Sequence, residues 1–574
     1  MIRRLDSALL ISLAAVATVA SSAWLAPGTA HACGGFFCNA STPVNQAAER
    51  IIFARAPSGA VTAVIQIQYT GPAERFAWML PVAGSPEVAV SSNTAFQLLQ
   101  SATNPSYLLT TTVEGSCRDD FLSGPSGSFA DAGAVSFDAG PRRDDVTVVN
   151  QGSVGPYDFV VIAVDPAATD PAAIAVSWLR DNSYDVSDFG ADRLSPYLMG
   201  GMNLLAFRLT KGNDTGSIRP VMLSFGNGAP SIPIRPTAVA ASDDMGVMVW
   251  VLGDHRAVPV NYMSLELNEA LINWINPSSN YNAVVTRAAN EAGGQGFVTE
   301  MAGSSAPLVD TIFGGFMSAE WERIQTQDWT GREGMLLFDV LNTFGSYDGI
   351  SDAIAATLPL PAGVTLAELL ACPACYVDYS VTDIEGFEPA DFLAAVTAQV
   401  IEPMERTRDL FSTSPYVTRL YTTMSADEMT RDPVFDFNPD LSDVSNQHNA
   451  DRVIECSPSI TQQQAPWRVH LPNGEVVRGR GTSWPFDASA GELPANARVV
   501  RVGTTGTGEV VEDNSAAIAE GLALHNDTIP RPRDPSERSW LCAASPGADA
   551  GDAGLGMLGL LVIGLLVAVR RRRG

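Results

Sequence analysis

Lysine and histidine are scarce in this chain of 574 residues. Lys211 is the only lysine, so Schiff-base chemistry, which needs a lysine amine, has a single candidate. Histidine occurs five times, and the four that lie beyond residue 32 stand singly as His255, His448, His470 and His525. A zinc site built on one pair of ligands needs a second pair close by, and single, scattered histidines do not supply one, so the sequence does not indicate a zinc site.

The chain also lacks the common catalytic motifs. It has no GxSxG nucleophile elbow, no HExxH zinc helix, no Walker A loop and no Rossmann fingerprint between a strand and a helix. GTTGTGEV, from Gly503, follows a strand-like VVRV, but its glycine spacing does not fit a nucleotide loop. These absences weigh against an enzyme, although an extracytoplasmic hydrolase whose site forms no motif stays open as the alternative.

Positive charge is in short supply. Against 63 acidic residues the chain has 35 lysines and arginines, which gives a formal net charge of −28. Such a surface repels phosphate backbones and anionic lipid headgroups, so nucleic-acid binding is not expected. The hydrophobic content of 46%, with 37 prolines and 49 glycines, is that of a globular protein with many turns and enough residues for two to four domains.

The N-terminus has the layout of a secretory signal peptide. Arg3 and Arg4 precede an apolar run over residues 8–23, and Ala30-His31-Ala32 forms an Ala-x-Ala cleavage site. We expect signal peptidase to cut after Ala32, which makes Cys33 the first mature residue. Lipidation of Cys33 is the alternative, although Ala30 and His31 fit a lipoprotein signal poorly.

The C-terminus combines Cys542, a spacer of small residues, an apolar stretch over 554–569 and the arginines 570–573. Sixteen helical residues span about 24 Å, a short membrane crossing, and the arginines would stay cytoplasmic. This layout resembles the MYXO-CTERM sorting signal of myxobacteria. The resemblance implies processing at Cys542 by a sorting protease and display at the cell surface or outer membrane. A plain tail anchor is the alternative.

Six further cysteines are disulfide candidates in an oxidising compartment: Cys33, Cys38, Cys117, Cys372, Cys375 and Cys456. Six cysteines allow 15 pairings, and the sequence does not choose among them. We expect Cys33 to fold back onto Cys38, with Cys117 as its other possible partner. For the CPAC motif at 372–375, a structural disulfide, a redox pair and half of a zinc site are the options, and its position after the helical LAELLA favours the first.

The body predicts an α+β fold, with a layered β-rich part, a helix-rich middle and a smaller β-rich C-terminal part. After the signal peptide at 1–32, the predicted regions are 33–264, with a flexible insertion at 123–145, then 265–431, 432–541 and the sorting tail 542–574. Strand patterns include VTAVIQIQY, ERFAWMLPV, YDFVVIAV, NLLAFRLT, PVMLSF and GVMVWVLG. The turn TGPA predicts that the first two form a hairpin, and both faces of GVMVWVLG are apolar, which indicates a strand inside a layered core.

Helical patterns follow residue 265. LNEALINWI and YNAVVTRAANEA are short candidates. The long candidate, FEPADFLAAVTAQVIEPMERTRDLF, has Pro389 in its first turn, an apolar stripe through Val396 and Val400, and a kink expected at Pro403. WRVHLPNGEVVRGRG predicts a hairpin with PNGE as its turn.

Several blocks together resemble the uncharacterised bacterial family known as domain of unknown function 2330. They are ACGGFFC, PVNQAAERIIF, IQIQYTGPAERFAWMLPV, VGPYDFVVIAV and EAGGQGFVTEMAG. The resemblance runs from Cys33 to at least Gly303 and is expected to continue past Arg431. It implies secretion and a cell-envelope setting, and it brings no known activity and no catalytic residues.

Two segments are candidate sites. In DFNPDLSDVSNQHNAD, Asp436, Asn438 and Asp440 place oxygen atoms at alternate positions, which is how a loop wraps calcium, although the segment is not an EF-hand and a solvated turn is the plainer interpretation. In GDHRAVPVNY, Asp254, His255 and Arg256 follow a buried strand. The sequence as a whole predicts a secreted, surface-anchored protein with structural, adhesive or ligand-binding work on an unknown envelope ligand.

Overall fold

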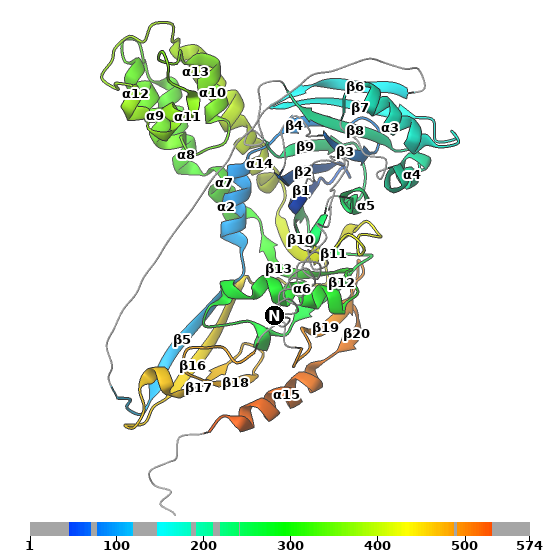
Figure 1. The fold of residues 1–574 in the computed structure, drawn as a ribbon, viewed down its shortest axis with the longest axis vertical. Coiled ribbons are helices and arrows are strands. Elements are labelled where there is room, and N and C mark those ends of the chain that lie inside the picture. The colour runs from blue at the N-terminus through cyan, green and yellow to red at the C-terminus, as the bar shows by residue number, and fades with distance from the viewer. Residues whose placement is uncertain are drawn as a thin grey trace, which may run out of the picture. The chain divides into compact units, whose positions relative to one another are not determined.

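The computed structural model describes residues 45–70, 77–118, 146–184, 191–210, 218–239, 241–486 and 491–530. The described residues up to Ile529 form one compact unit, in which three larger β-sheets and a two-stranded ribbon pack with helices (Figure 1). The predicted α+β class is confirmed. No helix within the described ranges is long and apolar enough to cross a membrane, and the predicted span at 554–569 lies outside those ranges.

The central sheet has ten strands in the order β20-β19-β12-β13-β14-β10-β1-β2-β9-β4. Neighbouring strands are antiparallel except for the parallel pairs β1 with β10 and β12 with β13. Strand β14 lies between β13 and β10 and so joins the two halves of the sheet. The strand bounds are β1 Asn45–Arg55, β2 Val61–Thr70, β4 Glu87–Val90, β9 Val221–Phe225, β10 Ala241–Gly253, β12 Met263–Leu267, β13 Gly296–Ser304, β14 Tyr416–Met424, β19 Asn496–Arg501 and β20 Glu509–Asp513.

Strand β10 separates two hydrophobic cores, as its sequence predicts. Val247, Val249 and Val251 belong to one core, whereas Trp250 and Leu252 belong to the other. All of these side chains are buried. Because successive side chains of a strand point to opposite faces, an all-apolar strand needs cover on both sides, and here both sides are covered.

A second sheet, in the order β3-β8-β7-β6, packs over one face of the central sheet through the core that contains Val247, Val249 and Val251. Its strands are β3 Ala77–Val82, β6 Val146–Val154, β7 Tyr157–Val164 and β8 Asn203–Leu209. The predicted hairpin between residues 61–69 and 74–82 is wrong, because β2 pairs with β1 and β9 while β3 pairs with β8. The two strands therefore lie in different sheets.

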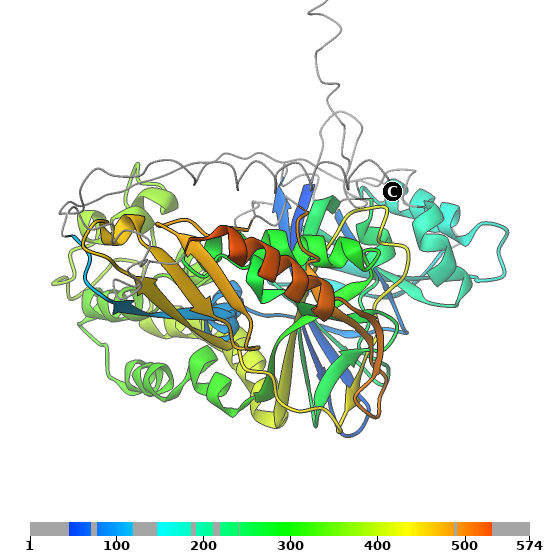
Figure 2. The ribbon, with the colours of Figure 1, turned by 90° about the horizontal axis from the view of Figure 1, so that it is seen from below.

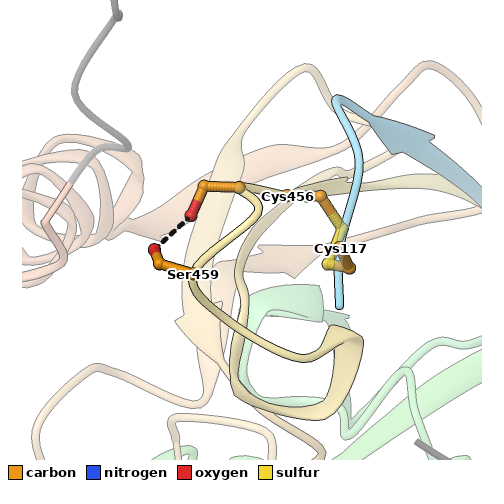
Figure 3. The surroundings of a disulfide bond; sticks show 4 residues. Cys117, Cys456 and Ser459 are labelled. Atoms are coloured by element: carbon orange, nitrogen blue, oxygen red, sulfur yellow. Dashed lines mark hydrogen bonds between the residues drawn. A yellow bond between two sulfur atoms is a disulfide. The ribbon is translucent and has the colours of Figure 1, made fainter. Parts of the chain in front are cut away.

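A third sheet has the order β18-β17-β16-β5, with β5 Ser106–Glu114, β16 Gln447–Glu455, β17 Pro466–His470 and β18 Val476–Arg480. The predicted hairpin around PNGE is confirmed as β17 and β18. Strands β5 and β16 run parallel, and a disulfide between Cys117 and Cys456 joins the chain just beyond their ends (Figure 3). The ribbon pairs β11 Arg256–Pro259 with β15 Phe435–Asn438.

Helices cover the remaining faces, and α8 to α13 gather in one cluster (Figure 1). Helix α15 lies against β18 and β19 (Figure 2). The bounds are α2 Asn93–Thr103, α3 Pro171–Asp181, α4 Ala191–Met199, α5 Ile234–Thr237, α6 Tyr281–Glu291, α7 Ala306–Phe313, α8 Gly315–Thr326, α9 Glu333–Phe344, α10 Ile350–Thr357, α11 Leu366–Ala371, α12 Pro373–Tyr376, α13 Pro389–Val396, α14 Glu402–Thr413 and α15 Ser515–Thr528.

Two helix predictions have different outcomes. The long candidate at 387–411 is present as α13 and α14, joined by a π-helical turn at Thr397–Ile401 directly before Pro403. Proline cannot donate a backbone hydrogen bond, so a wider turn next to it is expected. LNEALINWI is not an α-helix, because only Glu269–Leu271 form a single 3₁₀ turn there.

The three regions predicted between residues 33 and 541 share one sheet. Residues 33–264 supply β1, β2, β4, β9 and β10 of the central sheet, residues 265–431 supply β13 and β14, and residues 432–541 supply β19 and β20. The predicted insertion at 123–145 lies outside the described residues.

Candidate functional site

A polar cavity of about 730 Å³ lies on one face of the central sheet. Arg50 of β1, Met248 of β10 and Tyr421 of β14 form one side of it, and these residues are neighbours in the strand register. Asn104 at the end of α2 and Tyr281 of α6 lie on other sides. Further polar lining residues are Gln100, Ser278, Asn282, Thr286 and Thr423, and the acidic lining residues are Glu49, Asp244 and Glu300.

The cavity forms where helix α2 ends. Farther along the same face of the sheet, Ile52 and Trp250 are buried, and Phe96 of α2 meets the Trp250 ring edge-on at 6.0 Å between centroids. Helix α2 ends at Thr103, so it does not cover the next row of sheet residues, which includes Arg50. The sequence of β1 follows the end of the helix: on this face of the sheet, its side chains are apolar where α2 covers them and charged beyond the helix.

Arg419 of β14 holds the end of α2 in place. Its side chain is 2% exposed, and its guanidinium donates to the Gln100 carbonyl at 3.2 Å, to Thr103 Oγ1 at 2.9 Å and to Asn104 Oδ1 at 2.9 Å. A cation at the carboxyl end of a helix interacts favourably with the helix dipole. Arg419 also forms an ion pair with Glu300 of β13, with 2.6 Å between Nε and Oε2.

Glu300 connects this ion pair to α6. The Tyr281 hydroxyl donates to Glu300 Oε1 at 2.5 Å. Burial raises the pKa of Glu300, and Arg419 and Tyr281 act against that rise. Burial and the nearby Glu300 raise the pKa of Tyr281, so its hydroxyl keeps its proton. Tyr281, Glu300 and Arg419 thus form a fixed network in which each charge has a partner.

A second cavity, of about 500 Å³, adjoins the first and shares Pro105, Tyr107, Tyr281 and Glu300 with it. Its other sides come from β12, β19, β20 and the segment before β16. His448 of β16 lies here.

His448 is held in a defined orientation. Its Nδ1 atom is 2.7 Å from Glu269 Oε1, and its ring stacks on Tyr107 at 4.5 Å between centroids and 15° between planes. Across the described part of the chain, its Nε2 atom has no hydrogen-bond partner. A carboxylate at one imidazole nitrogen fixes the ring and leaves the other nitrogen available for proton transfer.

Arg50 differs from Arg419 because no carboxylate in the described residues forms an ion pair with it. Its Nη1 atom donates to Gln66 Oε1 at 3.0 Å, and Gln66 Nε2 in turn donates to Asn93 Oδ1 at 2.6 Å. Burial and the charge of Arg419 lower the pKa of Arg50. The first cavity therefore contains a positive group with only neutral hydrogen-bond partners.

The calcium candidates have partners within the protein. Asp436 pairs with Arg55 at 2.8 Å, and Asn438 Nδ2 donates to the Gly503 and Gly506 carbonyls. Asp440 Oδ2 accepts from the Gly506 amide at 2.7 Å. These bonds attach the segment to the turn between β19 and β20. The described residues contain no group of three or more His, Cys, Asp or Glu side chains placed to hold a metal ion.

The fold separates the members of the second sequence candidate, Asp254, His255 and Arg256. Asp254 and His255 are exposed in the turn between β10 and β11, and neither lines the two polar cavities. Arg256 does line the second cavity, where it donates to the Ser442 carbonyl at 3.1 Å. His448, rather than His255, is thus the histidine that has an acidic partner in a polar cavity.

Four of the candidate cysteines form two disulfides, Cys117 with Cys456 and Cys372 with Cys375. The possible pairing of Cys33 with Cys117 is wrong, because Cys117 is bonded to Cys456. Ala32, Cys33, Cys38, Lys211 and Cys542 lie outside the described residues.

Comparison with known protein families gives a match over part of the chain. Residues 27–310 match an uncharacterised protein family conserved in bacteria, domain of unknown function 2330. The predicted resemblance is confirmed over these residues, and the match does not include its expected continuation past Arg431. No curated protein and no solved structure matches the chain.

The matched residues contain much of the site, including Arg50, Tyr107, Tyr281 and Glu300, whereas Arg419 lies beyond them. None of these five residues belongs to a recognised motif in the sequence. The available signal was charge inside strand patterns, since Arg50 stands in the block PVNQAAERIIF and Glu300 in the block EAGGQGFVTEMAG.

Proposed function

We propose that this protein is an exported envelope protein that binds a small, hydroxyl-rich acid, such as a sugar acid, in the cavity around Arg50. The observation that carries the proposal is the partly buried guanidinium of Arg50, which donates to the neutral Gln66 and forms no ion pair within the described residues. Charges inside proteins are usually paired, so an anionic ligand is the expected partner.

The rest of the lining supports a polyhydroxylated ligand. Gln100, Asn104 and Asn282 offer amide donors and acceptors, and Ser278 and Thr286 offer hydroxyls. The rings of the lining tyrosines supply flat apolar surfaces beside these groups. Few, convergent polar groups in a concave site are typical of small-molecule binding.

Calorimetric titration with glucuronic acid, and with glucose as its neutral match, tests the proposal. A charge-assisted hydrogen bond contributes about 1.5–3 kcal/mol, so the acid should bind roughly ten- to hundredfold more tightly than glucose. Arg50→Gln should remove this preference. Arg501→Gln is the matched control, because Arg501 is exposed and paired with Glu509. Equal binding of both sugars, or binding of neither, would contradict the proposal.

One observation favours a second candidate function, extracytoplasmic hydrolysis. The Glu269–His448 pair presents Nε2 in the second cavity, where it would accept a proton from an attacking water molecule. No serine, threonine or cysteine of the described residues is hydrogen-bonded to His448, so direct attack by water is the form of hydrolysis that this geometry supports. Release of nitrophenol from 4-nitrophenyl glucuronide should occur with the native protein and be lost in His448→Gln. An inactive native protein rules this candidate out for that substrate.

We further propose cleavage by signal peptidase after Ala32, sorting through Cys542 by a C-terminal protease, and display at the cell surface or outer membrane. The two disulfides support export, because disulfides persist in oxidising compartments. Cell fractionation of Cys542→Ala should show protein held in membranes with its tail intact, whereas Ser545→Ala should be processed normally. Normal processing of Cys542→Ala would refute the sorting assignment.

A further inference from the structure

A third cavity, of about 220 Å³, lies between the central sheet and the second sheet. Strands β1, β2 and β9 line it from one side and β3 from the other. Its lining is mostly apolar and includes Ile51, Phe53, Ile65, Leu80, Leu223 and Phe225. Its size suits a ligand of roughly eight to ten non-hydrogen atoms, since an apolar cavity of about 150 Å³ holds benzene.

Glu49 brings a carboxyl group to this apolar cavity. It precedes Ile51 and Phe53 on β1 at alternate positions, so its side chain lies on the same face of the strand as theirs. Arg50, the next residue, points to the opposite face and lines the first polar cavity. Glu49 belongs to the lining of both cavities, whereas Arg50 lines only the polar one of the two.

Within the part of the chain that the structure describes, the Glu49 carboxyl group has no partner. The residue is 4% exposed, and its Oε2 atom is buried without a hydrogen bond. No ion pair with Glu49 exists among the described residues, and burial alone raises its pKa to about 7. An unpaired buried carboxyl group destabilises a folded protein. The neighbouring Ile51 and Phe53 show that the same strand face accepts apolar residues, so packing alone does not call for an acidic residue here.

The other acidic residue of the cavity wall is already satisfied. Asp432 accepts the Tyr197 hydroxyl at 2.7 Å and the Arg235 amide at 3.4 Å. Of the two carboxyl groups, only that of Glu49 is open to a ligand.

We propose that this cavity binds a small apolar amine, whose ammonium group pairs with Glu49 and whose hydrocarbon body lies against Ile51, Phe53 and Leu223. An ammonium group supplies both the charge and the hydrogen-bond donors that Glu49 lacks. The aliphatic and aromatic lining accepts the remainder of such a ligand. This cavity lies on the opposite face of β1 from the Arg50 side chain and takes a ligand of the opposite charge.

Calorimetric titration of the purified full-length protein with benzylamine, and with benzyl alcohol as its uncharged match, tests the proposal. At pH 8 benzylamine should bind at least tenfold more tightly than benzyl alcohol. Its affinity should fall by up to tenfold per pH unit below pH 7, as Glu49 takes up a proton while the amine stays charged.

Glu49→Gln should lose both the preference for the amine and the dependence on pH. Glu520→Gln, at an exposed position of α15, is the matched control and should behave like the native protein. Because glutamine has nearly the same shape as glutamate, the variant should fold, and its thermal unfolding confirms this before titration. Equal affinity for the two probes, or undiminished benzylamine binding by Glu49→Gln, would overturn the proposal.

Discussion

Replacing Glu49 by glutamine should make the stability of the protein less dependent on pH. The folded pKa of Glu49 is about 7, against 4.5 for an exposed glutamate. Below pH 4.5 the group is protonated in both the folded and the unfolded chain, so its contribution to stability is constant there. Between pH 4.5 and 7 the unfolded chain releases the proton and the folded chain keeps it. The free energy of unfolding therefore falls as pH rises through this range.

The size of the effect follows from the shift in pKa. Each unit corresponds to about 1.4 kcal/mol, so the whole shift removes about 3 kcal/mol of stability by pH 8. The amide of Glu49→Gln does not titrate. Relative to the native protein, the variant should thus gain about 3 kcal/mol between pH 4.5 and pH 8.

Urea unfolding at pH 4.5, 6 and 8, followed by tryptophan fluorescence, measures this change. Glu520→Gln provides the baseline, because Glu520 is exposed on α15. A stability difference between Glu49→Gln and the native protein that stays the same at all three pH values would refute the reasoning. Such a result would mean that water or an unseen partner solvates the carboxylate in the folded protein.

Three further predictions concern stability and are checked by urea unfolding at pH 7. Glu300→Gln should cost about 3–5 kcal/mol, because it leaves Arg419 buried without its counter-charge, and a cost below about 1 kcal/mol would contradict the pairing. Cys456→Ala should lower stability far more than Cys375→Ala, because its disulfide closes a much longer loop. The loop-closure entropy that a disulfide removes from the unfolded chain is at most about 6 kcal/mol for a separation of 339 residues and about 2 kcal/mol for a separation of 3. Equal losses of stability in the two variants would contradict this. Asp348→Asn should cost about 1–2 kcal/mol, because the Asp348 carboxylate accepts the amides of Asn93 and Thr94 at the start of α2, and an unchanged midpoint would argue against this cap.

Local sequence patterns predicted the elements well where burial follows a regular period. Strand β10 alternates between two cores, and the stripe through Val396 and Val400 faces one of them. The partners of the strands were not predictable in the same way. TGPA carries a turn signal, yet β3 pairs with β8, more than 100 residues away, because its apolar face is needed in the second sheet. Pairing between distant strands depends on the whole fold and leaves little trace in a short segment.

The residues of the candidate site were also not predictable from short segments of sequence. Arg419 stands in YVTRLYTTM, where an arginine usually indicates the exposed side of a strand. It is buried because Glu300 and the end of α2 come to it from 119 and about 315 residues away, and neither neighbour is visible from the local sequence. Disulfide bonding was expected from the predicted export, but the choice of Cys456 as the partner of Cys117 depends on the parallel pairing of β5 with β16.

The position of β14 in the central sheet has a consequence for the order in which the protein is made. Strands β4, β9, β2, β1 and β10 precede residue 254, and β12 with β13 precede residue 305, but the strand that joins these two groups spans Tyr416–Met424. During synthesis from the N-terminus, one edge of β10 and one edge of β13 stay unpaired until more than a hundred further residues have emerged. Unpaired edges of buried strands invite wrong pairing, so the growing chain is exposed to mispairing and aggregation until β14 has been made. For the same reason a fragment that ends at residue 310, where the family match stops, holds two separate pieces of a sheet.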